Sequence, residues 1–172
     1  APDVYEGSPT PITAFFSIVP KIAAIGILIR FLYEPFGEYI IEWRQILIFI
    51  SILSMILGSL AAIMQSNIKR LLAYSTIGHI GYIMIGIATG SKLGIEAVII
   101  YICIYVMMNA AIFALLLSIK SKNNKYIEEI SEFSGMSKRY PIISLLITIM
   151  MFSMVGVPPF AGFFGKFYIF IA

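Results

Sequence analysis

The chain has 172 residues, of which 60% are hydrophobic and 12% are charged, and its formal net charge is +3. This composition excludes an ordinary soluble globular domain, which carries about twice as many charged residues, and it indicates an integral membrane protein. With one cysteine, Cys103, and one histidine, His79, the sequence offers neither a disulfide framework nor a Cys/His metal cluster. It also lacks the glycine-rich motifs that bind nucleotides.

Apolar segments long enough to cross a bilayer core of about 30 Å follow one another along the chain. After a polar loop over residues 1–11, we expect spans at about 12–32, 45–64, 69–88, 94–119 and 141–172. The polar stretch 118–140 separates the last two spans, and residues 126–133 within it fit a short amphipathic surface helix. We therefore predict an all-α polytopic bundle of about five spans, with residues 1–172 forming part of one membrane domain. Because the chain starts without Met and stops in an apolar run, we expect a piece of a longer polypeptide.

The last span contains signals that end a helix. Residues 141–156 alone would be about 24 Å long as a helix, which is too short to cross the membrane. Proline lacks an N–H and clashes with the carbonyl four residues before it, so two prolines here should interrupt the helix. We predict one discontinuous helix, broken at Val155–Gly162, with a re-entrant hairpin as the alternative. The residues that mark the break are Gly156, Pro158, Pro159 and Gly162.

Basic residues are divided unequally between the two sides that these spans define. One side has seven: Lys69, Arg70, Lys120, Lys122, Lys125, Lys138 and Arg139. The other side has three: Arg30, Arg44 and Lys92. The positive-inside rule places residue 1 and the 118–140 loop on the cytoplasmic side, or on the matrix side of a mitochondrial membrane. We expect Lys69 and Arg70 to serve mainly as interface anchors.

Lys21 lies roughly 13 Å inside the first span, too deep for its side chain to reach water. Removal from water disfavours the ammonium form, so such a lysine can take up and release a proton. Ionisable residues at this depth usually mark an ion or proton path, and the alternative is a structural lysine with a counter-ion. Pro20 should interrupt the helix here and free the carbonyl of Phe16 as an acceptor for the ammonium or a water. All nine acidic residues lie in loops or at span ends, so we expect a counter-ion for Lys21 and Lys166 from outside this chain.

Two further spans carry polar residues at helical spacing. They are Ser75, His79 and Tyr82 in the third span, and Tyr101, Tyr105 and Asn109 in the fourth. Residues three and four apart share a helix face, and Gly78 and Gly81 should allow another helix to approach closely. Facing stripes of this kind could hold water and pass protons, with His79 as the titrating group. The alternative is interhelical hydrogen bonding with a purely structural role.

Lys166 follows the break in the last span by about two helical turns. Irregular backbone at membrane depth is tolerated only inside protein or beside a water-filled cavity. We therefore expect a proton-exit role for Lys166, near the far interface. The alternative is a kink that only shapes the bundle.

Three stretches together resemble a known family: APDVYEGSPTPITAFFSIVPKIA, QSNIKRLLAYSTIGHIGY and MFSMVGVPPFAGFFGKFY. In this order they are similar to the antiporter-like subunit N family (subunit 2 in mitochondria) of proton-pumping NADH:quinone oxidoreductase, respiratory complex I. The resemblance covers essentially the whole chain. A lysine at position 166 and the PDVYEG wording favour subunit N over its sister subunits.

The resemblance implies that the chain matches the eighth to the twelfth transmembrane helix of such a subunit. Lys21 then corresponds to the central lysine of the eighth helix, His79 to the tenth-helix histidine and Lys166 to the lysine of the broken twelfth helix. Tyr105 falls where a sister subunit has a second histidine. The family's Glu–Lys input pair would lie before residue 1, which would account for the missing counter-ion.

From the resemblance we expect a proton-translocating subunit of an oxidoreductase, with Lys21, His79 and Lys166 as the relay. The chain itself should hold no cofactor and no metal, whereas NADH, flavin, iron–sulfur clusters and quinone belong to partner subunits. Its partners should be other membrane-arm subunits, the lipid bilayer and protons, with no nucleic acid. The expected location is a bacterial inner membrane, or else the mitochondrial inner membrane. The alternatives are a subunit of an Mrp-type Na⁺/H⁺ antiporter or membrane-bound hydrogenase, and a structural membrane scaffold.

Overall fold

The computed structural model describes residues 2–120 and 126–172, so Lys122, Lys125 and residue 1 lie outside the described residues. In chain order the described residues form α1 (Pro2–Gly7), α2 (Thr10–Tyr33), η1 (Gly37–Tyr39), α3 (Ile40–Ile63), α4 (Ile68–Ala88), α5 (Lys92–Leu117), η2 (Ile130–Phe133), α6 (Met136–Arg139), α7 (Pro141–Val155) and α8 (Ala161–Ile171). The η elements are short 3-10 helices.

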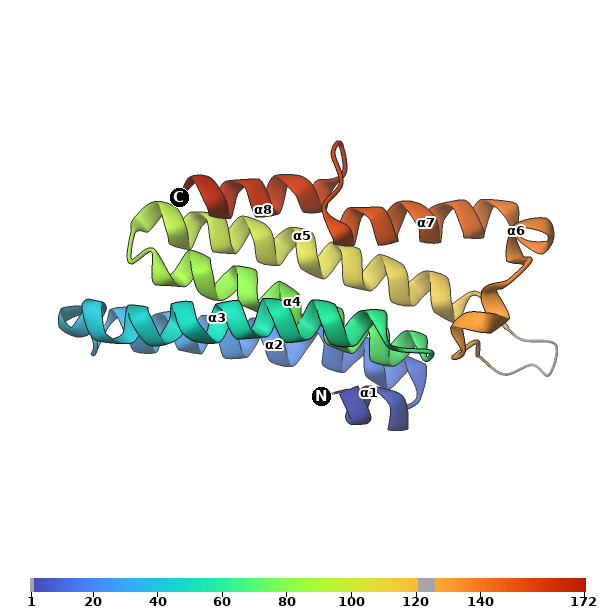
Figure 1. Ribbon diagram of the computed structural model, residues 1–172, viewed down its shortest axis with the longest axis horizontal. Helices are drawn as coiled ribbons and strands as arrows, with labels where there is room; N and C mark the ends of the chain where they lie inside the picture. The colour runs from blue at the N-terminus through green and yellow to red at the C-terminus, as the bar shows by residue number, and fades with distance from the viewer. Residues whose placement is uncertain (1, 121–125) are drawn as a thin grey trace.

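The long helices lie side by side, and α7 and α8 follow one another almost end to end along one side of the bundle (Figure 1). Helix α5 is central, since it packs against α2, α4, α7 and α8. The first residues of α4 contact α1, and Asn67 pairs with Glu129 from the stretch before α7. This end of the bundle is called the basic end, because it holds Lys69, Arg70, Lys120, Lys138 and Arg139.

The outer helices present apolar side chains to the surroundings. In α4 half of the most apolar 18-residue window is buried, against 17% in α2 and in the η1–α3 segment. The exposed residues of α3 include Phe49 and Ile63, with exposed fractions of 65% and 81%. An apolar outer face is stable in lipid and unfavourable in water. Among the described residues, four helices are long and apolar enough to span a membrane, and α7 and α8 are shorter apolar helices, which confirms the predicted polytopic helix bundle.

Helices α3 and α4 approach each other closely at small residues. A Cβ on Gly58 would lie 2.5 Å from the backbone nitrogen of Gly78, and one on Gly81 would lie 3.0 Å from the carbonyl oxygen of Ser51. The Ser51 hydroxyl also donates to the Gly81 carbonyl at 2.7 Å. Gly81 therefore acts as predicted. The space beside a Cβ on Gly78 is open, so at that contact the glycine that the packing needs is Gly58.

The predicted interruption of the last span is confirmed between α7 and α8. Helix α7 ends at Val155, and Gly156 closes it in the left-handed conformation with φ +91°. This conformation suits glycine because it strains residues that carry a Cβ. The Pro158–Pro159 peptide bond is cis. Helix α8 begins at Ala161, so Gly162 lies in its first turn rather than in the loop.

Two polar segments differ from the sequence-based expectation. Residues 2–7, expected as a loop, form α1, because Pro2 suits a helix start and Asp3 in the first turn favours the positive end of the helix dipole. In the stretch 126–133, expected as an amphipathic helix, only Ile130–Phe133 is helical, as a 3-10 turn. The residues before it are extended, since the Ile68 N–H donates to the Glu128 carbonyl and the Ile130 N–H donates to the Ser66 carbonyl, both at 2.8 Å.

Candidate functional site

Lys21 reaches across from α2 to hydroxyl groups on α4 and α5. Its Nζ donates to Thr76 Oγ1 at 3.1 Å and to the Tyr105 hydroxyl at 2.9 Å. Thr76 Oγ1 and the Tyr105 hydroxyl are themselves 2.9 Å apart, so the three groups form a closed triangle. Thr13 and Ser17, at four-residue spacing before Lys21, are fully buried on the same face of α2. This face directs the lysine into the bundle.

Pro20 does not break the helix that carries Lys21. Helix α2 is continuous from Thr10 to Tyr33 with Pro20 inside it, so the predicted break at this residue is wrong. The carbonyl of Phe16, which loses its usual donor, accepts from the hydroxyl of Tyr5 at 3.5 Å. A replacement donor of this kind allows a membrane helix to continue through a proline. The expected acceptor role of Phe16 for Lys21 is not seen, since the ammonium turns to Thr76 and Tyr105.

His79 lies beside both tyrosines of α5. Its side chain is buried, with an exposed fraction of 4%. The Nδ1 atom is 2.5 Å from the hydroxyl of Tyr101, and the imidazole ring centroid is 5.1 Å from that of Tyr105. A single helix face on α5 therefore links His79 to the Lys21 triangle through neighbouring aromatic side chains. His79 of the first predicted stripe thus contacts Tyr101 and Tyr105 of the second.

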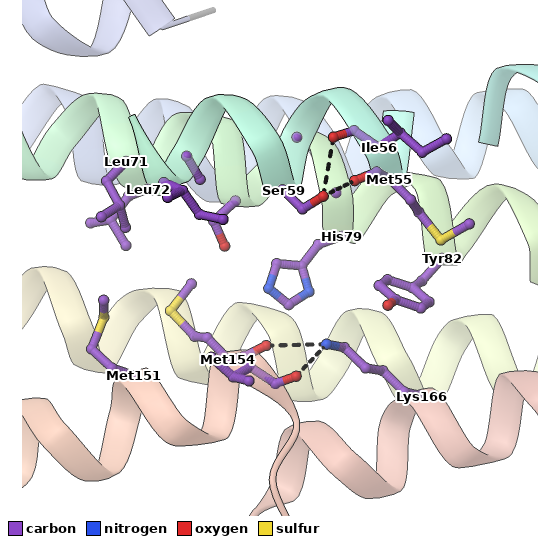
Figure 2. Close-up of a pocket in the computed structure, with 16 residues that line it drawn as sticks. Met55, Ile56, Ser59, Leu71, Leu72, His79, Tyr82, Met151, Met154 and Lys166 are labelled. Carbon is purple, nitrogen blue, oxygen red and sulfur yellow. Dashed lines mark hydrogen bonds between the residues drawn. The ribbon is translucent and has the colours of Figure 1, made fainter. Parts of the chain in front are cut away.

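The remaining members of the stripes lie elsewhere. Ser75 and Tyr82 line a cavity of about 480 Å³ between α3, α4 and α7, together with His79 and Lys166 (Figure 2). Ser75 thus lies away from Tyr105. Thr76 makes the contact with Tyr105 that we expected of Ser75. Asn109 is fully buried, and its Nδ2 donates to the Tyr105 carbonyl of its own helix at 3.0 Å. The Asn109 Oδ1 atom has no partner among the described residues, and such a buried acceptor usually binds water.

Lys166 binds the end of α7 from the first turns of α8. Its Nζ donates to the Val155 carbonyl at 2.7 Å and to the Met154 carbonyl at 3.4 Å (Figure 2). Both carbonyls lack a helical donor because the residues four positions later are Pro159 and Pro158. A helix C-terminus carries partial negative charge, so this position favours an ammonium group. The ammonium also lies 4.7 Å from the centroid of the Tyr82 ring.

The side chain of Lys166 therefore turns back toward the break, since helical side chains lean toward the helix N-terminus. We expected the residue near the far interface, and the structure instead places its ammonium against the end of α7. Within residues 2–120 and 126–172, neither Lys21 nor Lys166 forms an ion pair with a carboxylate. Hydroxyl and carbonyl oxygens are their polar contacts.

Two contributors were missed by sequence reasoning. Thr76 follows Ser75 directly, and helical spacing from His79 favours either of them, so the periodicity alone did not separate the two. Tyr5, expected in a polar loop, is buried with an exposed fraction of 5% and lies against Lys21. The sequence did contain a signal for Tyr5. A tyrosine just before a helix that contains a proline can donate to the carbonyl that the proline leaves without its usual donor. The side chains that these contacts connect form a polar array of Lys21, Thr76, Tyr105, His79, Tyr101, Tyr82 and Lys166.

Comparison with known proteins places the chain in a described family. The family model for "NADH:quinone oxidoreductase/Mrp antiporter, TM" matches residues 1–172. NADH-quinone oxidoreductase subunit N of Pelagibacter ubique is 57% identical over 172 residues, covering 100% of this chain and 36% of the relative. The subunit N of Paramagnetospirillum magneticum is 52% identical, covering 100% of this chain and 35% of the relative. The chain thus spans about a third of the length of these curated relatives.

Two solved structures have a similar fold. A chain of respiratory complex I from Thermus thermophilus with bound aureothin superposes with a TM-score of 0.79 and is 35% identical, with 99% of this chain and 36% of that chain covered. A chain of the membrane-bound sulfane sulfur reductase, an archaeal respiratory membrane complex, gives a TM-score of 0.86 at 30% identity, with 99% and 35% covered. By its full-length match, the chain belongs to the NADH:quinone oxidoreductase/Mrp antiporter family of membrane subunits, as the sequence motifs predicted.

Proposed function

We propose that this chain carries the second half of a proton path in a subunit N of a proton-pumping NADH:quinone oxidoreductase. Lys21 takes up the proton, the groups around Tyr105 and His79 pass it on, and Lys166 releases it toward the end of the bundle opposite the basic end. The proposal is supported by about 50% identity to bacterial subunits N along the whole chain.

The position of His79 between two half-buried lysines carries the proposal. His79 contacts Tyr101 and Tyr105 on one side, and on the other it lines the same cavity as Lys166. Lys21 is hydrogen-bonded to Tyr105. Each neighbouring pair in the array is therefore in contact or shares a cavity. The cavity has a volume of about 480 Å³ and a mainly apolar wall, so waters in it would be held beside its few polar residues, among them Ser75, His79 and Lys166.

The oxygens around the two lysines suit different steps. A hydroxyl group both accepts and donates a hydrogen bond, so Thr76 and Tyr105 can pass a proton onward from Lys21. A carbonyl only accepts, so Met154 and Val155 can hold a charged Lys166 but cannot carry its proton further. The cavity extends from Lys166 toward Ile63 and Leu71 near the basic end, so release toward the opposite end requires water at the α7–α8 break or along α8.

Alanine substitution of each lysine in the full-length subunit tests the proposal. In the assembled complex in sealed vesicles, Lys21→Ala and Lys166→Ala should each reduce the number of protons pumped per NADH oxidised severalfold, because each removes a protonatable group that no neighbour replaces. Lys92→Ala is the matched control, since the Lys92 side chain is 91% exposed. Normal pumping by an intact complex that carries either variant would contradict the role of that lysine.

A second candidate function is sodium/proton antiport without electron transfer. The family description names Mrp antiporters beside the oxidoreductase. The identity of about 50% to subunits N favours the oxidoreductase. Vesicles discriminate the two functions: a pump moves protons when NADH is oxidised, whereas an antiporter responds to an imposed ion gradient.

The remaining parts of the proposal concern the surroundings of the chain. We propose that electron transfer among NADH, flavin, iron–sulfur clusters and quinone takes place in partner subunits, because one cysteine and one histidine do not suffice to ligate such clusters. Other membrane-arm subunits would be the partners, and a bacterial inner membrane the location. We propose further that the basic end faces the cytoplasm.

A further inference from the structure

The short helix α1 places the ring of Tyr5 against the ammonium of Lys21. The Nζ of Lys21 is 5.4 Å from the centroid of the Tyr5 ring, within the range of a cation–π contact, and it donates to the hydroxyl of Tyr105 at 2.9 Å. Tyr5 is buried, and its hydroxyl donates to the Phe16 carbonyl that Pro20 leaves free. Burial raises the pKa of Tyr5, so its phenol stays protonated and remains a donor.

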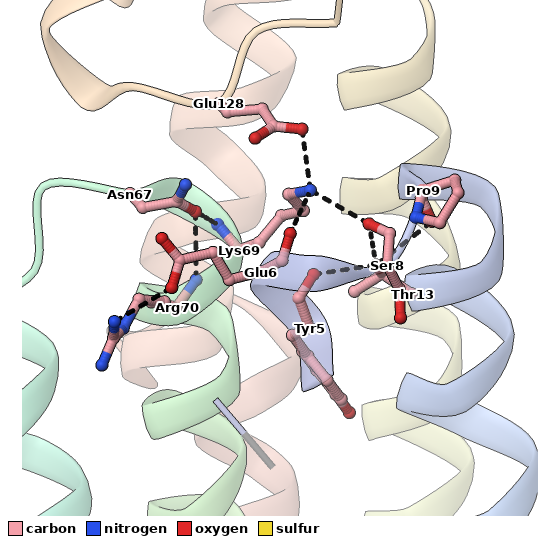
Figure 3. Close-up of polar contacts among 9 residues, drawn as sticks. All are labelled: Tyr5, Glu6, Ser8, Pro9, Thr13, Asn67, Lys69, Arg70 and Glu128. Carbon is pink, nitrogen blue, oxygen red and sulfur yellow. Dashed lines mark hydrogen bonds and ion pairs between the residues drawn. The ribbon is translucent and has the colours of Figure 1, made fainter. Parts of the chain in front are cut away.

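A buried lysine at the start of α4 anchors α1. Lys69 Nζ donates to the carbonyls of Glu6 and Ser8 at 3.0 and 3.1 Å and forms an ion pair with Glu128 at 2.7 Å (Figure 3). Its side chain is only 3% exposed, so Lys69 is not the interface anchor that we expected. One ammonium therefore joins three segments that are far apart in the sequence: α1, α4 and the stretch before α7.

Further contacts fix α1 from both sides. The hydroxyl of Thr13, which is fully buried on α2, donates to the Tyr5 carbonyl at 3.1 Å. Arg70 pairs with Glu6 at 2.9 Å and with Asp3 at 3.6 Å. A six-residue helix is too short to be stable by itself, so its position depends on such contacts. The contacts of Thr13 and Lys69 are shielded from water, since both side chains are buried.

We propose that α1 is a hydration barrier for Lys21, in which the Tyr5 ring closes the basic-end side of the ammonium to water and Lys69 holds α1 in place. Tyr5 and Lys69 are then positioning residues for the proton path. This inference rests on the proposed function for its purpose, because a lysine that passes a proton inward needs protection from water on the side from which protons could leak back.

Removal of either residue should open the barrier for a physical reason. Without the Tyr5 ring, the space between α1 and α2 is no longer filled, and the Phe16 carbonyl loses its donor. Without the Lys69 ammonium, the carboxylate of Glu128 and two backbone carbonyls lose their shared partner. An element held by fewer contacts opens more often, and buried groups beneath it then meet water.

A cysteine beside Lys21 reports this opening without any measurement of pumping. Ser17 is fully buried midway between Thr13 and Lys21 on the same face of α2. In the full-length subunit within the detergent-solubilised complex, Ser17→Cys is combined with Cys103→Ser, because native Cys103 is exposed. The rate of modification by a water-soluble methanethiosulfonate reagent is then measured. We expect slow modification in this parent and in Tyr5→Phe, which keeps the ring.

Tyr5→Ala and Lys69→Met should each speed modification about tenfold or more, as local opening becomes more frequent. Lys92→Met, which removes an exposed lysine next to Glu96, should leave the rate unchanged. Fast modification in the parent, or an unchanged slow rate in both Tyr5→Ala and Lys69→Met, would overturn the barrier. If Tyr5→Ala does not assemble, Lys69→Met decides the question alone. If Lys21→Ala pumps normally while Tyr5→Ala exposes the cysteine, the proposed function fails and the barrier stands.

Discussion

The hydroxyl of Thr76 on α4 connects Lys21 on α2 with Tyr105 on α5. It accepts from Lys21 Nζ at 3.1 Å, lies 2.9 Å from the Tyr105 hydroxyl and is also 2.9 Å from the Leu72 carbonyl of its own helix. Hydrogen bonds to charged groups contribute about 1.5–3 kcal/mol, roughly twice as much as those between neutral groups. Thr76 is therefore a small residue from which a large effect on proton transfer is expected.

Thr76→Val should slow NADH-driven proton pumping about tenfold if the transfer from Lys21 limits the rate, because valine keeps the shape of threonine and removes the hydroxyl. Thr76→Ser, which keeps the hydroxyl, should retain most of the activity. The measurement is the initial rate of proton uptake by vesicles that contain the assembled complex.

Thr148 provides a matched control for this substitution. Its hydroxyl bonds the Ser144 carbonyl of its own helix at 2.9 Å, as Thr76 does with Leu72, but it lies on the exposed side of α7. Thr148→Val should leave the pumping rate unchanged. Equal rates for Thr76→Val and the unmodified protein would show that the Lys21 proton does not depend on this hydroxyl.

The sequence alone identified those residues of the array whose charge or titration is unusual in an apolar run. Lys21, His79 and Lys166 stand out because ionisable groups inside membrane spans are costly. Thr76 did not stand out, because threonine is tolerated in any membrane helix and Ser75 beside it fits the spacing from His79 equally well. A step of one residue turns a helix by about 100°, and it decides whether a hydroxyl faces Lys21 or the cavity.

At the scale of helices, Pro20 and the pair Pro158–Pro159 had opposite effects on the apolar runs that contain them. Pro20 leaves α2 continuous, since the Tyr5 hydroxyl replaces the missing donor. At the α7–α8 break, two successive prolines follow Gly156, whose left-handed conformation already ends α7. The free carbonyls of Met154 and Val155 at the break accept hydrogen bonds from Lys166. The sequence predicted a disturbance at both sites. The left-handed Gly156 and the proline pair end α7, whereas the single Pro20 leaves α2 continuous.

The contact between α3 and α4 depends on Gly58, and alanine at this position should destabilise the protein. A Cβ there would lie 2.5 Å from the Gly78 nitrogen and 2.9 Å from the Tyr74 carbonyl oxygen, both of them backbone atoms. Because backbone cannot move aside as a flexible side chain can, Gly58→Ala should cost about 1–3 kcal/mol of stability. The midpoint of thermal unfolding of the purified full-length protein in detergent measures this loss.

Gly78→Ala is the control on the facing helix, since its Cβ would meet no described atom within 4 Å. This variant should be neutral or slightly more stable, because alanine restricts the unfolded chain more than glycine does. An unfolding midpoint for Gly58→Ala at or above that of Gly78→Ala would mean that the two helices can separate without cost.

At the scale of the whole molecule, hydropathy alone predicted the all-helical class and the four long apolar helices. Apolar length is sufficient for this because a membrane helix satisfies its own backbone hydrogen bonds. Hydropathy does not say which helices are neighbours. That α5 packs against α2, α4, α7 and α8, and that α1 folds back onto α4, follows from contacts between residues far apart in the sequence. Hydropathy likewise did not predict the burial of Lys69, because three segments that are distant in the sequence together exclude water from it.

The direction of the proposed proton path depends on which end of the bundle faces the cytoplasm. The basic end holds Lys69, Arg70, Lys120, Lys138 and Arg139, and the opposite end holds Arg30, Arg44 and Lys92. Positive charges close to the ends of membrane helices are retained on the cytoplasmic side, so the basic end should face the cytoplasm. Because α8 leads from Lys166 away from the basic end (Figure 1), a proton released along α8 would then leave the cell interior.

Single cysteines at the two ends test this orientation in vesicles of known sidedness. In a Cys103→Ser background, Ser134→Cys lies in an exposed position at the basic end, and Glu38→Cys lies in an exposed position between α2 and α3 at the opposite end. A membrane-impermeant maleimide added to inside-out vesicles should label Ser134→Cys and spare Glu38→Cys, and right-side-out vesicles should give the reverse. The swapped pattern would place the basic end outside, and Lys166 would then have to take up protons rather than release them.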